Sequence, residues 1–373
     1  MTDRHRHPLT EAQIADTGAF IADRQTPEGK LPWIPDAKWD PWDHVHAAMG
    51  LVLAGRLAEA LRAFDYLVRT QLPEGGWHQE WHGETLVSDA QETNHAAYIA
   101  TGLWHLYLHT GERDFLVEYW PTMERAIDFV VGMQLPNGSI AWLLNKGKIW
   151  KAPLVTGSSS VHGSLVCAIR IAETLGLERP AWRAARRRLA NVLRTNIEAF
   201  EDTDLPEGPG RFSMDWYYPV LGGALRGVHA WRRLLDPQLV GRFLQEGVGA
   251  RCERDRPWYT TAETCELVLA LDACGLHSRA RQVFNWVKHL RSPAGGYYTG
   301  RTHPENIIWP VEEQTLYTAA TVLIAADALT GLSATSGLFR AMAGVPRPAA
   351  VRPWPRMIED AGDTAADADS ARG

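Results

Sequence analysis

Two consecutive helical segments differ in where they place their apolar side chains. Residues 162–176 are apolar on nearly every side, whereas residues 180–197 carry one apolar stripe and a face of arginines. A helix that is apolar all round is buried all round, and a helix with one stripe covers a core on that side alone. The pattern therefore predicts an inner helix followed by an outer one.

The same alternation recurs along the chain at intervals of roughly 45 to 65 residues, which is typical of repeated helical hairpins. Inner helices are expected to begin near Trp42, Glu92, Ser158, Trp216, Glu263 and Glu313. Outer helices are expected near residues 10–24, 57–71, 115–133, 180–198, 235–247 and 276–290. Six hairpins with one helix inside and one outside predict an all-α (α/α)6 barrel.

The barrel is expected to form a single domain over residues 10–340, because repeat-built barrels stay undivided at this length. Residues 1–9 and the Pro-, Ala- and Asp-rich residues 341–373 lack a packable apolar pattern, and we expect them to be disordered. The charged N-terminus has no apolar run after it, which argues against a signal peptide. No segment is long and apolar enough to span a membrane. We therefore expect a cytoplasmic protein.

Composition narrows the chemistry. The net charge is −6 and no long run of Lys or Arg is present, so nucleic acids and anionic membranes are poor partners. The four cysteines lack the paired spacing of a metal site, and no phosphate-binding or dinucleotide-binding glycine motif occurs. We therefore expect no metal and no cofactor. The 16 tryptophans are unusually many, and most of them lie in loops.

The segments that precede the expected inner helices share carboxylates and aromatic side chains. All six inner helices of an alternating barrel begin at the same end, so these side chains converge there. Helix capping explains the carboxylates but not the tryptophans. Aromatic rings beside carboxylates suit a sugar, because rings pack on its C–H faces and carboxylates accept its hydroxyls. We predict a small carbohydrate substrate, contacted by Trp39, Trp42, Asp43, Trp81, Glu92, Trp216, Tyr217, Trp258, Trp309 and Glu312.

Two of these segments resemble glucoamylase-like glycoside hydrolases with an (α/α)6 barrel. "WDPWDHVHAAMGL" is similar to the first inner helix of that family, and "WPVEEQTLYTAATVLIAADAL" is similar to the last. The resemblance covers about residues 10–335. It implies an inverting glycosidase that acts on a glucoside-like non-reducing end, with Glu313 as the base that activates water. It also implies that Trp42 and Asp43 hold the terminal sugar.

The chain departs from that family at the catalytic acid. The family has a glutamate after a tryptophan before its sixth helix, and here Lys151 follows Trp150. We therefore expect another carboxylate, Glu263, Asp215 or Glu92, to serve as the acid, with Glu263 or Asp215 as the leading candidates. An inverting pair stands roughly 6.5–9.5 Å apart. The sequence leaves open the sugar, the linkage, the stereochemical course and the oligomeric state.

Two further functions stay open from the sequence. The loops "QLPEGGW" and "QLPNGSIAW" resemble repeats of squalene–hopene cyclases and prenyltransferases, so a terpene-type cyclase is one alternative. The acidic motifs that those enzymes use for protonation or for magnesium diphosphate do not occur here. A catalytically inactive sugar-binding barrel is the other alternative, because Lys151 stands where the acid is expected.

Overall fold

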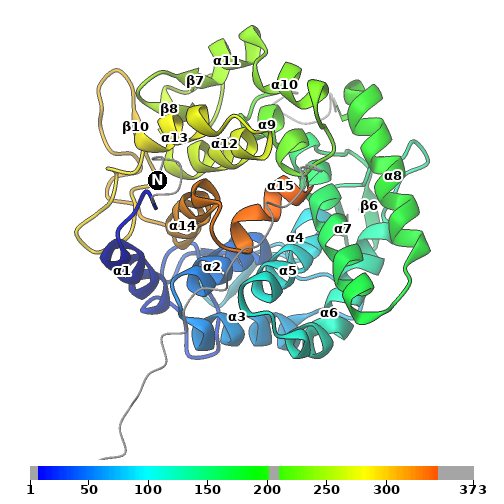
Figure 1. The fold of residues 1–373 in the computed structure, drawn as a ribbon. Coiled ribbons are helices and arrows are strands. Elements are labelled where there is room, and N and C mark those ends of the chain that lie inside the picture. Colours follow the sequence, from blue (N-terminus) through cyan, green and yellow to red (C-terminus); the bar gives the residue numbers. More distant parts are fainter. Residues whose placement is uncertain (1–6, 201–209, 343–373) are drawn as a thin grey trace, which may run out of the picture.

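The computed structural model describes residues 7–200 and 210–342. Within them, the inner ring consists of α2 (Pro41–Leu53), α4 (Thr93–Ala97) with α5 (Ile99–Thr110), α7 (Val155–Leu175), α9 (Met214–Leu221), α12 (Thr261–Ala273) and α14 (Leu316–Thr330). Each inner helix packs on the next in chain order, and α14 packs on α2, which closes the ring (Figure 1). The predicted (α/α)6 barrel is confirmed.

The outer ring covers this core. It consists of α1 (Glu11–Ala22), α3 (Leu57–Thr70), α6 (Arg113–Gly132), α8 (Pro180–Thr195), α10 (Val228–Leu234) with α11 (Pro237–Phe243), and α13 (His277–Asn285). Helices α7 and α8 differ in burial in the way that their sequence patterns predict. Most of α7 is buried, whereas α8 buries Trp182 and Leu189 and exposes Arg187 and Arg188. Arg186, which was expected to be exposed with them, is half-buried.

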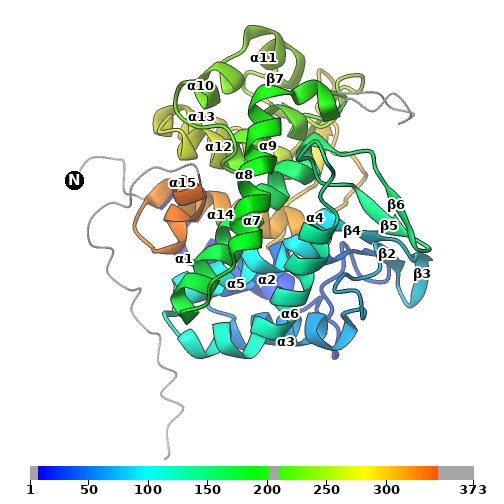
Figure 2. The same cartoon turned by 90° about the vertical axis from the view of Figure 1, so that its right-hand side faces the viewer.

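Short strands at one end of the barrel were not predicted. The described residues form three small antiparallel sheets: β1 (Lys38–Trp39), β2 (Glu80–His82) and β3 (Thr85–Ser88); β4 (Gln91–Glu92), β5 (Leu143–Asn145) and β6 (Lys148–Trp150); and β7 (Leu244–Gln245), β8 (Gly249–Arg251), β9 (Trp258–Thr260) and β10 (Gly300–Thr302). Strands β1, β4 and β9 lead directly into α2, α4 and α12. The sheets therefore surround the end where inner helices begin, which we call the mouth (Figure 2).

The opposite end is closed by α15 (Leu338–Met342) (Figure 2). Arg340 donates to both carboxylate oxygens of Asp272 near the end of α12, at 2.7 and 3.0 Å, and to the carbonyl of Ala328 in α14 at 2.6 Å. Met342 is buried. The ordered barrel thus runs two residues past its expected limit, and the rest of the predicted tail lies outside the described residues, as do residues 1–6.

Two further observations concern the thiols and the membrane. All four cysteines are free. No single helix of the described chain has the length and apolarity to cross a membrane. The pair of Leu316–Thr330 and Thr335–Met342, bent by 89°, meets that length and composition only when its two parts are counted together.

The inner ring depends on close helix contact, which predicts a contrast between two glycines. A Cβ atom on Gly50 of α2 would lie 2.7 Å from the Cβ of Ala320 in α14, whereas one on Gly241 of α11 would meet nothing within 4 Å. We expect Gly50→Ala to lower the free energy of unfolding by roughly 1–3 kcal/mol. Gly241→Ala should leave it unchanged or raise it by up to about 1 kcal/mol. Urea unfolding measures both, and equal effects would contradict this packing.

Candidate active site

Aromatic rings from four inner-ring positions meet at the mouth. Trp42, in the first turn of α2, has its ring centroid 5.8 Å from that of Tyr98 and 6.0 Å from those of Tyr218 in α9 and Tyr317 in α14. Since α2 and α9 lie on opposite sides of the ring, Trp42 spans its centre. We call these four side chains the aromatic floor. Trp42 is half-buried, and the three tyrosines are buried.

A single carboxylate lies beneath this floor. Glu266 of α12 is only 1% exposed, and it accepts hydrogen bonds from the hydroxyls of Tyr217 at 2.8 Å, Tyr218 at 2.5 Å and Tyr317 at 2.8 Å. Burial raises the pKa of Glu266 to about 7, although the three hydroxyls favour its ionised form. The carboxylate thereby fixes two rings of the floor. Glu266 was not predicted as a site residue, although it follows Glu263 by one helical turn in a mostly apolar helix.

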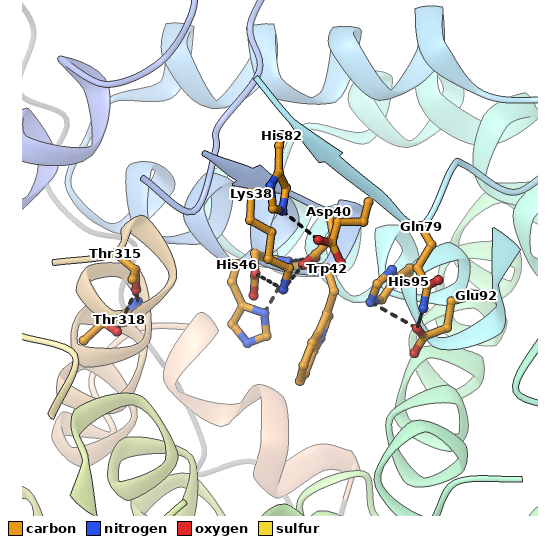
Figure 3. A network of polar contacts seen from close by, with 12 residues as sticks. Lys38, Asp40, Trp42, His46, Gln79, His82, Glu92, His95, Thr315 and Thr318 are labelled. Carbon is orange, nitrogen blue, oxygen red and sulfur yellow. Dashed lines mark hydrogen bonds and ion pairs between the residues drawn. The ribbon is translucent and has the colours of Figure 1, made fainter. Parts of the chain in front are cut away.

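Two aspartates and a lysine stand beside Trp42. Asp40 caps α2 by accepting from the backbone amide of Asp43 at 2.8 Å, and Lys38 contacts Asp40 at 2.7 Å and Asp43 at 3.5 Å (Figure 3). Burial opposes ionisation at both aspartates, but the close Lys38 ammonium holds the pKa of Asp40 well below its usual range. Burial and the negative charge of Asp40 raise the pKa of Asp43 well above its usual range. Within this pair, the surroundings of Asp43 thus favour its protonated form more than those of Asp40 do.

A third polar group lies at the second inner helix. Glu92 ends β4 and precedes α4, and it accepts a hydrogen bond from Gln79 at 3.0 Å. The ring of His95 lies 3.6 Å from the same carboxylate (Figure 3). Glu92 is 9% exposed. The side-chain oxygen of Asn94 and Nδ1 of His95 are buried there, and no hydrogen-bond partner for them occurs in the described part of the chain.

The other expected carboxylates occupy different positions around the mouth. Glu263 is half-buried in the first turn of α12, and burial together with the charge of this carboxylate raises the pKa of the Cys252 thiol. Asp215 opens α9 and accepts from Thr156 at 2.6 Å, and burial raises its pKa. Glu313 precedes α14 and accepts from Thr299 at 3.0 Å. Glu313 and the exposed Glu312 line a separate pocket together with Phe20 and Arg24 of the outer segment.

The expected aromatic contacts fall into two groups. Trp39, Trp216 and Tyr217 are at most 2% exposed. They lie in the core behind the mouth, where Trp39 donates to His44 at 3.0 Å and Trp216 donates to the carbonyl of Arg233 at 2.9 Å. These three residues are buried and bind protein partners, so they support the surface of the mouth from behind and do not contribute to that surface themselves. The remaining expected rings, Trp81, Trp258 and Trp309, are half-buried or exposed on or beside the sheets.

No cluster of three or more His, Cys, Asp or Glu side chains that could hold a metal ion occurs in residues 7–200 and 210–342. The mouth presents carboxyl groups beside a floor of aromatic rings. Such an arrangement can bind a sugar and carry out acid–base catalysis on it.

Comparison with known proteins identifies the family. No family model matches the chain. The MMP endo-(1,4)-3-O-methyl-alpha-D-mannosidase of Mycolicibacterium hassiacum is 43% identical over 332 residues, which cover 89% of this chain and 90% of that protein. The chain belongs to the family of this glycoside hydrolase. Family membership favours the expected glycoside hydrolase over the terpene cyclase and the inactive barrel.

Solved structures share the fold of this family member. A glycosidase variant in complex with glucose is 16% identical, with a TM-score of 0.64, over 86% of this chain and 97% of its own. A D-mannose isomerase is 13% identical, with a TM-score of 0.61, over 85% of this chain and 95% of its own. At these identities the likeness shows the (α/α)6 fold alone. The resemblance to glucoamylase-like enzymes thus stands at the level of glycoside hydrolases with this fold.

The raised pKa of Glu266 predicts how the stability of the protein changes with pH. Its pKa is raised in the folded protein to about 7, so its contribution is full below the unfolded pKa near 4.5 and is lost as pH rises through 7. We expect the free energy of unfolding of the wild type, minus that of Glu266→Gln, to fall by roughly 3 kcal/mol between pH 5 and pH 8. Urea unfolding at several pH values measures this difference, in which the titration of buried histidines cancels. A difference independent of pH would show that Glu266 is ionised throughout.

Proposed function

We propose that the chain is an endo-acting α-mannosidase that cleaves 1,4 linkages inside chains of 3-O-methylmannose. The observation that carries this proposal is the 43% identity over nearly the whole length of both proteins. The proposal takes the place of the exo-acting glucosidase expected from the sequence, because the relative is named for internal cleavage of a methylated mannoside.

The aromatic floor supports a methylated substrate. A 3-O-methyl group replaces a hydroxyl donor by an apolar group, so a wall of rings is a better partner for it than a further carboxylate. The rings of Trp42 and Tyr218 meet edge to face at the centre of the mouth, and the indole Nε1 of Trp42 is buried without a partner in the described residues. In the proposed complex the sugar ring packs against Trp42.

In the proposed reaction, Asp43 is the general acid. The acid must hold a proton at neutral pH, and burial beside Asp40 favours the protonated form of Asp43. Asp43 gives this proton to the glycosidic oxygen as the bond from that oxygen to the anomeric carbon breaks. Lys38 contacts both aspartates and then stabilises the carboxylate that Asp43 becomes.

Glu263 is the proposed base. It takes one proton from the water that attacks the anomeric carbon, and the product leaves with its new hydroxyl on the opposite face of the ring. Helices α2 and α12 flank α14, so the first turns that carry Asp43 and Glu263 lie on either side of the first turn of α14, which carries Tyr317. An inverting reaction requires roughly 6.5–9.5 Å between the two carboxyl groups when the substrate and water are bound.

Variants of four carboxylates test this assignment. Asp43→Asn and Glu263→Gln should each lower kcat on a 3-O-methylmannose oligosaccharide by at least about a hundredfold, with unchanged melting temperature, because a proton-transfer group is lost without a change of shape. Asp215→Asn and Glu313→Gln, which change the other two catalytic candidates named from the sequence, are the comparison. Loss of turnover in one of them, with full activity of Asp43→Asn or Glu263→Gln, would overturn the proposed pair.

A leaving group that needs no protonation separates the two roles. Asp43→Asn should regain turnover on a dinitrophenyl glycoside of the same oligosaccharide, because its phenolate leaves without an acid. Glu263→Gln should not regain it, because the attacking water still lacks a base. The release of dinitrophenolate measures both, and equal behaviour of the two variants would contradict the division of roles.

A further inference from the structure

The sheet β4-β5-β6 presents three side chains in one line that leads outward from Glu92. The strand register pairs Glu92 with Leu143 and Leu143 with Trp150. Residues directly opposite one another in antiparallel strands have their side chains on the same face of the sheet, and neighbouring strands lie about 4.8 Å apart. The line therefore runs about 10 Å from a carboxylate at the mouth to a tryptophan on the outermost strand.

The far end of this line is the solvent-accessible ring of Trp150, which packs against neighbouring side chains of the hairpin. The side chain of Trp150 is 47% exposed, whereas Leu143 beside it is buried. The ring of Trp142 meets that of Trp150 edge to face, with centroids 6.3 Å apart. The hairpin turn is two residues long, Lys146 and Gly147, and both have positive φ. This is the arrangement of a tight turn that fixes the register of its strands.

The inner end of the line has unsatisfied polar groups. Buried polar atoms are nearly always hydrogen-bonded, so each orphan needs an explanation. Oδ1 of Asn94, Nδ1 of His95 and Nε1 of Trp142 are all buried without a partner in the described structure, and they lie on the segments next to Glu92 and Leu143. Asn94 is only 4% exposed. A polar ligand or ordered water at this end would satisfy them.

We propose that the face of β4-β5-β6 that carries Glu92 and Trp150 is an outer sugar subsite. In it, a methylated mannose unit beyond the cleaved bond packs on the indole of Trp150. This inference rests on the proposed endo-mannosidase activity. An enzyme that cleaves inside a chain must hold sugar units on both sides of the bond, so it needs contacts beyond the aromatic floor.

The chemistry of this face suits an uncharged, methylated sugar chain. The ring of Trp150 offers an apolar surface for C–H and O-methyl groups. Asn145 and Lys148 lie on the same face by strand alternation, and their side chains can donate to ring and hydroxyl oxygens. Lys151 follows the strand, where glucoamylase-like enzymes have their acid. In the proposed subsite, the segment of Trp150 and Lys151 therefore binds sugar and does not transfer a proton.

The strand itself supplies a matched control. Ile149 precedes Trp150, is 46% exposed, and points to the opposite face of the sheet, in register with Leu144 and Gln91. A general effect of losing an exposed apolar side chain from this hairpin would appear equally in Ile149→Ala and Trp150→Ala. An effect on sugar binding would appear only in Trp150→Ala.

The experiment measures kcat/KM on 3-O-methylmannose oligosaccharides of graded length. For the wild type and Ile149→Ala, kcat/KM should rise as the chain grows long enough to reach the hairpin. For Trp150→Ala, the ratio of kcat/KM between long and short chains should fall about tenfold through a higher KM, which corresponds to one lost ring contact of about 1.4 kcal/mol. Trp150→Phe should retain most of the ratio, and melting temperatures check the fold of each variant.

Each outcome has one meaning. If the wild type cleaves the oligosaccharides and Trp150→Ala shows the same dependence on length as Ile149→Ala, the outer subsite is overturned and the proposed function stands. If the wild type cleaves none of them, the proposed function is overturned, and the subsite for this chain with it. A tenfold loss confined to long chains in Trp150→Ala supports both.

Discussion

The mouth of the barrel depends on one buried carboxylate. A carboxylate removed from water is costly unless hydrogen bonds replace its hydration, and Glu266 is satisfied by three tyrosine hydroxyls from α9 and α14. Two of these tyrosines, Tyr218 and Tyr317, pack against Trp42. The position of the ring on which a sugar is proposed to lie therefore depends on a carboxyl group buried beneath it. The Glu266 carboxyl group, the tyrosine hydroxyls and the Trp42 ring thus form one connected network across four inner helices.

The connectivity of the barrel gathers the polar and aromatic groups of the candidate site at one end. Inner helices all begin at the mouth, so their first turns collect capping carboxylates and the short strands that lead into them. The other end is closed by α15 through the ion pair of Arg340 with Asp272. The same arrangement gives the sheet β4-β5-β6 a direct path from Glu92 to the solvent-exposed Trp150.

The helical part of this structure could be predicted from the sequence, and the strands could not. Burial on every side gives inner helices such as α7 a pattern that differs visibly from the one stripe of α8. Strands of two to four residues carry no such period. Carboxylates at helix starts marked Asp43 and Glu263 as candidates. Glu266 and its tyrosines escaped notice because a polar residue one turn inside an apolar helix shows its role only when its partners, far away in sequence, are brought beside it.

The central claim is that the sugar lies on the aromatic floor between Asp43 and Glu263. A crystal structure of the Asp43→Asn variant with a bound 3-O-methylmannose oligosaccharide tests it most directly. The account predicts a sugar ring packed on Trp42, a glycosidic oxygen within hydrogen-bond distance of residue 43, and a water between the anomeric carbon and Glu263. An oligosaccharide seated instead in the pocket of Glu312, Glu313 and Arg24, with Trp42 untouched, would contradict it.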